Sequence, residues 1–301
     1  MRQTERLPDG RRIDYREFGS AAGVPGIYLH GTPSSGSEGR WLDAAGLRAG
    51  VRVVAPDRPG YLESDAPATP SLVATAEDLV ALADALGLDR FAVVGFSGGA
   101  GYALATAHLA QDRVTVAHVG GGVGALAGDA GKSLPWSRRA PFLLAARAPR
   151  AVEPVVAGGM RLFRRAIEKR LDAPVEAAEW FFKGPAQGAQ IGAVADYVQA
   201  TPPEDLRADL ADHARGVAST RAIIADLVAY GRPWPFDLRT VDVPVEIWHG
   251  RNDPAAPFAF AERAAAELPQ ATLHAFDGEG HFVFHSHADE IAGSIAERAR
   301  C

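Results

Sequence analysis

The chain has 301 residues and a single cysteine, Cys301. One cysteine excludes an internal disulfide and any metal cage built on several cysteine ligands. Cysteine usage therefore leaves the redox compartment open, with a slight preference for the cytoplasm.

Targeting and membrane signals are also missing. The opening residues, MRQTERLPDGRR, lack the apolar segment of a signal peptide, so we expect a cytoplasmic protein. Residues 91–111 are uncharged and long enough to cross a bilayer, but they include glycines, a serine, a threonine and a histidine. We interpret them as a buried strand followed by a buried helix, and we expect no membrane partner.

Basic residues are fewer than acidic ones. The chain has 31 Lys and Arg against 37 Asp and Glu, a net charge of −6, and we find no basic domain that would bind nucleic acid. Hydrophobic residues make up 47% and charged residues 23%, values that exclude a disordered or fibrous protein. The expected partner is a small molecule, and the expected state is a monomer or a homodimer.

Short apolar runs alternate with helical stretches, which is typical of a parallel sheet with crossover helices. The expected strands of this kind are 26–30, 51–55, 91–95, 114–119, 243–249 and 271–276. Residues 12–18 alternate after a Pro-Asp-Gly turn and predict one arm of an antiparallel hairpin at the sheet edge. Residues 71–86 predict an amphipathic helix, which Ser71 can cap and Gly87 can end, and 287–300 predict a final helix.

Strand patterns stop between residues 124 and 237, where the chain is rich in alanine and arginine and has helical periodicity. We predict a helical cap at 124–237, inserted into a core formed by 1–123 and 238–301. The expected helix breaks are Pro154, Pro174, Pro185, Pro202 and Pro203. The arginines are expected on a solvated face. The expected cap core, part of which could roof a pocket, consists of Trp136, Trp180, Phe181, Phe182 and Trp234.

The most informative motif is GFSGG at residues 95–99, a G-x-S-x-G sequence between an expected strand and an expected helix. A nucleophile elbow needs small residues two positions before and after the nucleophile, and Gly95 and Gly99 meet that need. Ser97 is the predicted nucleophile, at a helix N-terminus that favours developing negative charge. A dinucleotide-binding loop is disfavoured, because the next strand ends in glycines rather than in an acid.

A serine nucleophile needs a base, and the base needs an orienting acid. Asp253 follows the strand expected at 243–249, and His281 follows the last expected strand. We predict His281 as the base and Asp253 as the acid. Asp57 is the alternative acid if the strands are assigned differently.

Zinc is the alternative role for the histidines at this end of the chain. His285 and His287 lie close to His281, but no carboxylate or cysteine completes a familiar zinc spacing. We therefore expect no metal. Glu279 is expected to face solvent.

Three motifs together resemble the α/β-hydrolase superfamily, in its esterase and proline-iminopeptidase branch. They are the elbow, HGTP at residues 30–33, similar to the family's H-G-x-P oxyanion loop, and DRPGYLES at 57–64, similar to its D-R-x-G-x-G-x-S turn. The resemblance implies a mostly parallel eight-stranded sheet flanked by helices, with a helical cap after strand 6. It also implies the chain order Ser97, Asp253, His281 for a catalytic triad.

The resemblance places an oxyanion hole at the backbone N–H groups of Thr32 and Gly98. The implied supporting residues of the elbow and oxyanion loop are His30, Gly31, Gly95 and Gly99. Leu62 departs from the family pattern, because a glycine usually stands there, and the departure predicts a differently shaped loop.

The implied activity is that of a cofactor-independent serine hydrolase, which cleaves a small to medium carboxylic ester, lactone or related acyl bond. Epoxide hydrolases and haloalkane dehalogenases carry aspartate where this chain has Ser97, which argues against both activities. Thr32 and Gly98 stand where proline iminopeptidases typically have other residues, which weakens the interpretation of this chain as such a peptidase. An amidase, a thioesterase, a C–C bond hydrolase and a receptor-like binder with little turnover stay open.

Overall fold

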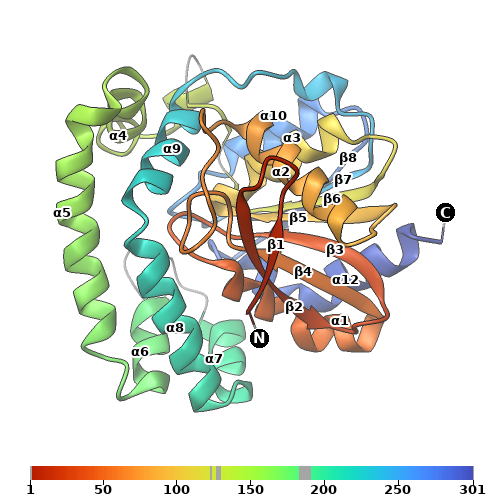
Figure 1. Ribbon diagram of the computed structural model, residues 1–301, viewed down its shortest axis with the longest axis horizontal. Coiled ribbons are helices and arrows are strands. Elements are labelled where there is room, and N and C mark those ends of the chain that lie inside the picture. The colour runs from red at the N-terminus through yellow and green to blue at the C-terminus, as the bar shows by residue number, and fades with distance from the viewer. Residues whose placement is uncertain (1, 123, 127–129, 183–190, 301) are drawn as a thin grey trace.

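The computed structural model describes residues 2–122, 124–126, 130–182 and 191–300 (Figure 1). Its described part contains an eight-stranded sheet of order β1-β2-β4-β3-β5-β6-β7-β8. The strands are β1 (Arg2–Arg6), β2 (Arg12–Gly19), β3 (Val24–Leu29), β4 (Val51–Pro56), β5 (Phe91–Phe96), β6 (Val114–Gly120), β7 (Val245–Gly250) and β8 (Ala271–Phe276). β2 pairs antiparallel with both β1 and β4, and all the other neighbouring strands, in the order β4-β3-β5-β6-β7-β8, pair parallel. The predicted fold class is confirmed.

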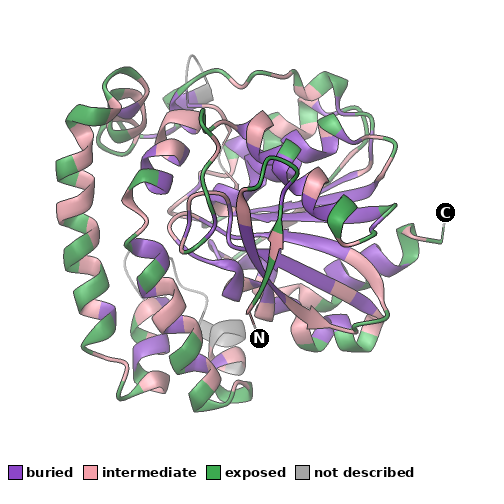
Figure 2. Ribbon diagram, viewed as in Figure 1, coloured by how far each residue is buried: buried purple, intermediate pink, exposed green. Residues whose placement is uncertain are grey.

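Helices cover both faces of the sheet, so the central strands β5 and β6 are buried along their whole length (Figure 2). On one face lie α2 (Leu72–Ala85), α3 (Ala100–Leu109) and α10 (Ala259–Glu267), and on the other lie α1 (Asp43–Ala49) and α12 (Ala288–Arg298). Each face has its own hydrophobic cluster. The edge strand β1 is largely exposed and polar.

Several local predictions are confirmed. The hairpin arm at 12–18 is β2, which pairs with β1, and the helix predicted at 71–86 is α2. The Ser71 hydroxyl caps α2 by accepting the Ala74 N–H at 3.0 Å, and Gly87 follows its end with φ +65°. The uncharged stretch 91–111 forms β5 and α3. None of the helices described in the structure is both long and apolar enough to span a bilayer.

Helices also make up most of the described chain between β6 and β7, on one side of the sheet in Figure 1. They are α4 (Trp136–Arg147), α5 (Pro149–Glu168), α6 (Pro174–Phe182), α7 (Ile191–Ala200), α8 (Pro203–Val217) and α9 (Thr220–Gly231). The division into a core and a cap at residues 124 and 237 stays a prediction.

Two details of the helical segment differ from expectation. Pro154 does not break a helix, because it lies within the N-terminal half of α5 on an exposed face, where its ring costs one backbone hydrogen bond. Pro174 and Pro203 are each the first residue of a helix, and Pro185 lies outside the described residues.

Trp136 is 69% exposed and belongs to no core, because it begins α4 on an outward face.

Asp57 has a structural environment at the end of β4. Its Oδ1 accepts hydrogen bonds from Arg16 Nη1 at 2.9 Å and from the Gly36 N–H at 2.8 Å. Burial raises the pKa of Asp57 more than the Arg16 charge lowers it. Asp57 therefore holds β2, β4 and the segment after β3 together rather than orienting a histidine.

We predict that Asp57→Asn lowers the free energy of unfolding by about 3 kcal/mol, because it leaves the buried Arg16 with a weakened partner. Urea unfolding measures the loss. The control Glu17→Gln, at the part-exposed Glu17–Arg52 pair, should cost at most about 1 kcal/mol. A folded Asp57→Asn protein with normal stability and no activity would move the catalytic acid to Asp57.

Candidate active site

The elbow is built as its sequence predicts. β5 ends at Phe96, Ser97 follows with φ +50°, and the next residues lead into α3. A Cβ at Gly95 would lie 2.6 Å from the Gly99 carbonyl oxygen, and one at Gly99 would lie 2.1 Å from the Leu29 carbonyl oxygen. The glycines are therefore required by close backbone approach, and they allow Ser97 to occupy a left-handed conformation that is strained for a serine.

Ser97, His281 and Asp253 form a hydrogen-bonded series. Ser97 Oγ lies 3.0 Å from His281 Nε2, and His281 Nδ1 lies 2.8 Å from Asp253 Oδ2. The three residues follow β5, β8 and β7, so the carboxyl edge of the parallel sheet brings them together. The structure thus assembles the three residues that were predicted from motifs far apart in the sequence.

The surroundings of Asp253 keep its carboxyl group ionised. Its Oδ1 accepts the N–H groups of Ala255 at 2.7 Å and Ala256 at 2.9 Å. Burial alone would raise the pKa of Asp253, but hydrogen bonds and the His281 charge hold it below its usual range. The charged carboxylate can then orient the imidazole and stabilise its protonated form.

The loop after β3 lies against the elbow. A Cβ at Gly98 would lie 3.0 Å from Thr32 N, so the two backbone segments predicted to form the oxyanion hole are in close contact. His30 is buried behind this loop, where its Nδ1 donates to the Gly31 carbonyl at 2.8 Å and its Nε2 accepts the Arg58 N–H at 3.0 Å. Burial holds the pKa of His30 well below its usual value, which suits a neutral structural role.

Sequence reasoning missed a buried carboxylate behind the same loop. The carboxylate of Asp226, on α9, accepts hydrogen bonds from both terminal nitrogens of Arg58, each at 2.8 Å. It also accepts a hydrogen bond from the Thr32 hydroxyl. The hydroxyls of Tyr61 and Tyr102 donate to it at 2.6 and 2.5 Å. Burial raises the pKa of Asp226, but Arg58 and these donors outweigh burial and hold it below its usual range. No motif marks Asp226, because its partners lie more than a hundred residues earlier in the chain.

One turn later on α9, Tyr230 reaches the other half of the predicted oxyanion hole. Its hydroxyl donates to the Gly98 carbonyl at 3.0 Å and accepts the Gly101 N–H at 2.9 Å. A single helix therefore contacts Thr32 through Asp226 and Gly98 through Tyr230. Leu62, at the position where the family that the sequence resembles usually has glycine, adopts φ +49° and donates its N–H to Ser219 Oγ, just before α9, at 3.0 Å.

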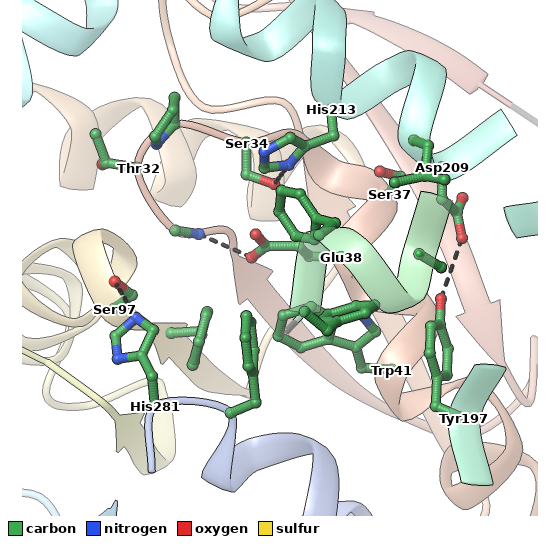
Figure 3. A pocket seen from close by; sticks show the side chains of 18 of the residues that line it. Thr32, Ser34, Ser37, Glu38, Trp41, Ser97, Tyr197, Asp209, His213 and His281 are labelled. Carbon is green, nitrogen blue, oxygen red and sulfur yellow. Dashed lines mark hydrogen bonds between the residues drawn. The ribbon is translucent and has the colours of Figure 1, made fainter. Parts of the chain in front are cut away.

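A cavity of about 120 Å³ lies in front of Ser97 and His281 (Figure 3). Its aromatic lining consists of Trp41, Phe96, Phe163, Phe181, Phe182 and Phe282. Its polar lining consists of Thr32, Ser34, Ser37, Glu38, Ser97, Tyr197, Asp209, His213 and His281. Helices α5, α6, α7 and α8 contribute to the walls, so Phe181 and Phe182 border the pocket, as the sequence allowed.

The histidines near His281 do not gather into a metal site. Among the residues described, no group of three His, Cys, Asp or Glu side chains is placed to hold an ion. His287 bonds Glu279 Oε1 through Nε2 at 2.9 Å and Glu290 through Nδ1 at 3.2 Å. Glu279 is thus half-buried and hydrogen-bonded to His287, and it does not simply face solvent as expected.

An eight-stranded, mostly parallel sheet with a Ser–His–Asp series at its carboxyl edge defines the α/β-hydrolase class. The family model for the alpha/beta hydrolase fold matches residues 27–288. The chain belongs to this family.

Relatives of several kinds resemble the chain. A non-heme chloroperoxidase of Streptomyces lividans is 28% identical over 293 residues, 94% of each chain. A 2-hydroxymuconate semialdehyde hydrolase of Pseudomonas putida is 26% identical and covers 96% of this chain and 90% of its own. The solved esterase EaEST from Exiguobacterium antarcticum has a TM-score of 0.66 at 20% identity, with complete coverage of both chains, and shows the fold alone.

We predict that Asp253→Asn lowers kcat by about 10⁴ while the protein stays folded, because an amide at this position favours the wrong histidine tautomer. Steady-state kinetics and circular dichroism measure the two effects. The control Asp277→Asn, at an acid 93% exposed, should have normal kinetics. Nearly full activity in Asp253→Asn would contradict the assignment.

We predict that Tyr230→Phe lowers kcat about tenfold and leaves KM within about twofold, because it frees the Gly98 carbonyl without touching the cavity. The control Tyr15→Phe removes a hydroxyl that donates to Gln3, far from the site, and should leave kcat unchanged. An equal effect of the two changes, or an effect of Tyr230→Phe on KM alone, would show that Tyr230 does not position the elbow.

Proposed function

We propose that this protein is a cofactor-independent serine hydrolase that cleaves a small to medium carboxylic ester, lactone or related acyl bond. The observation that carries the proposal is the unbroken hydrogen-bonded series from Ser97 through His281 to Asp253. This series supplies a nucleophile, a base and an orienting acid at one sheet edge.

In the proposed mechanism, Ser97 Oγ attacks the substrate carbonyl carbon while His281 Nε2 takes the hydroxyl proton. The tetrahedral oxyanion accepts hydrogen bonds from the backbone N–H groups of Thr32 and Gly98. Collapse breaks the bond to the leaving alkoxide, which receives the proton from His281. The acyl-enzyme remains, with its acyl group on Ser97.

Deacylation repeats the same steps with water. His281 removes a proton from the water as its oxygen attacks the acyl carbon, and then returns that proton to Ser97 Oγ when the carboxylic acid leaves. Asp253 stays ionised throughout and stabilises the imidazolium. The proposed reaction consumes one ester and one water, and it needs no redox partner.

The volume and the walls of the cavity support a small substrate. Its volume of about 120 Å³ and its walls from four helices of the inserted segment suit a single small acyl compound. The relatives carry different activities in their names, so the bond type rests on the site of this chain. We propose an ester as the first candidate substrate, because His281 can protonate the leaving alkoxide and no further group is needed to release it.

We predict that a fluorophosphonate probe labels Ser97, and that Ser97→Ala abolishes labelling and lowers kcat for short-chain esters by about 10³ to 10⁶. His281→Ala should lose nearly as much activity, because the triad acts as one unit. Intact-protein and peptide mass spectrometry locate the adduct.

The control Ser294→Ala changes a serine on α12 and should be labelled and active as the parent. An adduct on a different serine, or no adduct on the folded parent, would contradict the nucleophile assignment. Labelling of Ser97 without hydrolysis of any ester, lactone or amide would instead favour a receptor-like binder.

A further inference from the structure

One wall of the active-site cavity is polar and lies beside the aromatic part of its lining. Ser34 and Glu38 come from the segment after β3, and His213 comes from α8. We call these three residues the Glu38 cluster. Figure 3 shows Glu38 in the cavity between the Ser97–His281 pair and His213.

Glu38 lies close to the nucleophile. Its Oε2 accepts the Gly31 N–H at 2.8 Å. A Cβ built on Gly31 would lie 3.3 Å from Ser97 Cβ and 3.6 Å from Glu38 Oε1, so one small group could touch both side chains. A substituent near the reacting carbonyl of a bound acyl compound is therefore within reach of the carboxyl group.

The hydrogen bonds within the cluster leave one buried nitrogen without a partner. Ser34 Oγ lies 3.1 Å from His213 Nδ1, and Ser34 also bonds the Glu38 carboxyl. His213 Nε2 has no hydrogen-bond partner in the described part of the chain, although it is shielded from water. The rings of Phe163 and Phe181 pack edge-on around this imidazole. A buried polar atom left unpaired costs free energy that a ligand can recover.

The charge states determine what kind of ligand fits. Burial raises the pKa of Glu38 to about 7, against the lowering effects of Ser34 and the Gly31 N–H. Burial lowers the pKa of His213 to about 4, so its imidazole is neutral near pH 7. When Glu38 is ionised, the Ser34 hydroxyl donates to it and accepts from His213 Nδ1. Nε2 then carries a lone pair, and the cluster presents acceptors alone.

The other lining residues of the cavity also favour a ligand that donates hydrogen bonds. Asp209 also lines it, bonded to Arg40 Nε at 2.6 Å and to Tyr197. Among the described lining residues, none is a lysine or an arginine. A substrate carboxylate or phosphate would meet no cation there, whereas a donor group would meet carboxyl oxygens and an imidazole nitrogen.

We propose that the Glu38 cluster is a subsite for a hydrogen-bond-donating substituent, a hydroxyl or an amine, carried by the substrate close to the scissile carbonyl. This inference rests on the proposed acyl hydrolysis and specifies its substrate class. The preferred substrates are hydroxy- or amino-substituted acyl compounds, and plain alkanoyl esters are poorer ones. Discrimination is strong when a site built for a polar group receives an analogue that leaves its polar atoms unpaired.

The test compares esters of matched size in a pH-stat assay. The donor series is methyl 2-hydroxybutanoate, methyl 3-hydroxybutanoate and methyl 3-aminobutanoate, and the controls carry a methyl group in place of the donor. We expect kcat/KM at least about tenfold higher for one donor ester than for its methyl counterpart. A preference for the hydroxyl ester over the amino ester, or the reverse, identifies the donor.

Two variants connect that preference to the cluster. Glu38→Gln keeps an oxygen for the Gly31 N–H but removes the charge, and it should reduce the ratio of kcat/KM for a donor ester to kcat/KM for its methyl counterpart at least about threefold. His213→Phe should reduce the preference through loss of Nε2. Glu77→Gln, at an exposed position on α2, is the matched control and should behave as the parent.

The outcomes separate the two proposals. Equal or faster hydrolysis of the methyl controls by the parent overturns the subsite and leaves the serine hydrolase intact. An equal fall for every ester in Glu38→Gln also overturns the subsite, because it would show that Glu38 only supports the Gly31 loop. If no ester in either series is hydrolysed and Ser97 is not labelled, the proposed function fails and the subsite with it.

Discussion

The buried ion pair between Arg58 and Asp226 is the interaction on which the site depends. Both side chains are removed from water, so each charge relies on the other, and removal of one partner from such a pair costs about 3–5 kcal/mol. Arg58 also donates to the His30 carbonyl at 3.0 Å, and Asp226 accepts the Thr32 hydroxyl. The pair therefore joins α9 to the loop that carries one half of the predicted oxyanion hole.

Helix α9 also contacts the second backbone segment beside Ser97. Because Tyr230 bonds the Gly98 carbonyl, the helix that anchors the loop after β3 also supports the elbow. The neighbouring α8 places His213 beside Ser34, which follows the same strand β3. The helices between β6 and β7 thus support both backbone segments around Ser97 and supply part of the cavity wall.

The hydrogen-bonded series of Ser97, His281 and Asp253 could be predicted because a local motif marks Ser97. A G-x-S-x-G sequence demands close backbone packing at Gly95 and Gly99, and chain order then points to an acid and a histidine after later strands. The exposure of single side chains was harder to predict. Trp136 was expected in a core and is exposed, because an apolar residue in a helix does not show which face of that helix packs against another element. Pro154 was expected to break a helix, but on the exposed face of α5 it is tolerated.

The sequence by itself predicted one hairpin arm, six parallel strands, the helices at 71–86 and 287–300, the elbow, and Ser97, Asp253 and His281 as candidate site residues, because each depends on periodicity or on a short motif. Only the tertiary structure decided that Asp226 supports the loop of Thr32 and that Glu38 faces the cavity with His213. These contacts join residues more than 160 positions apart, on helices whose patterns resemble any amphipathic helix. A buried charge acquires its role from the partners that folding brings to it, and no local pattern encodes those partners.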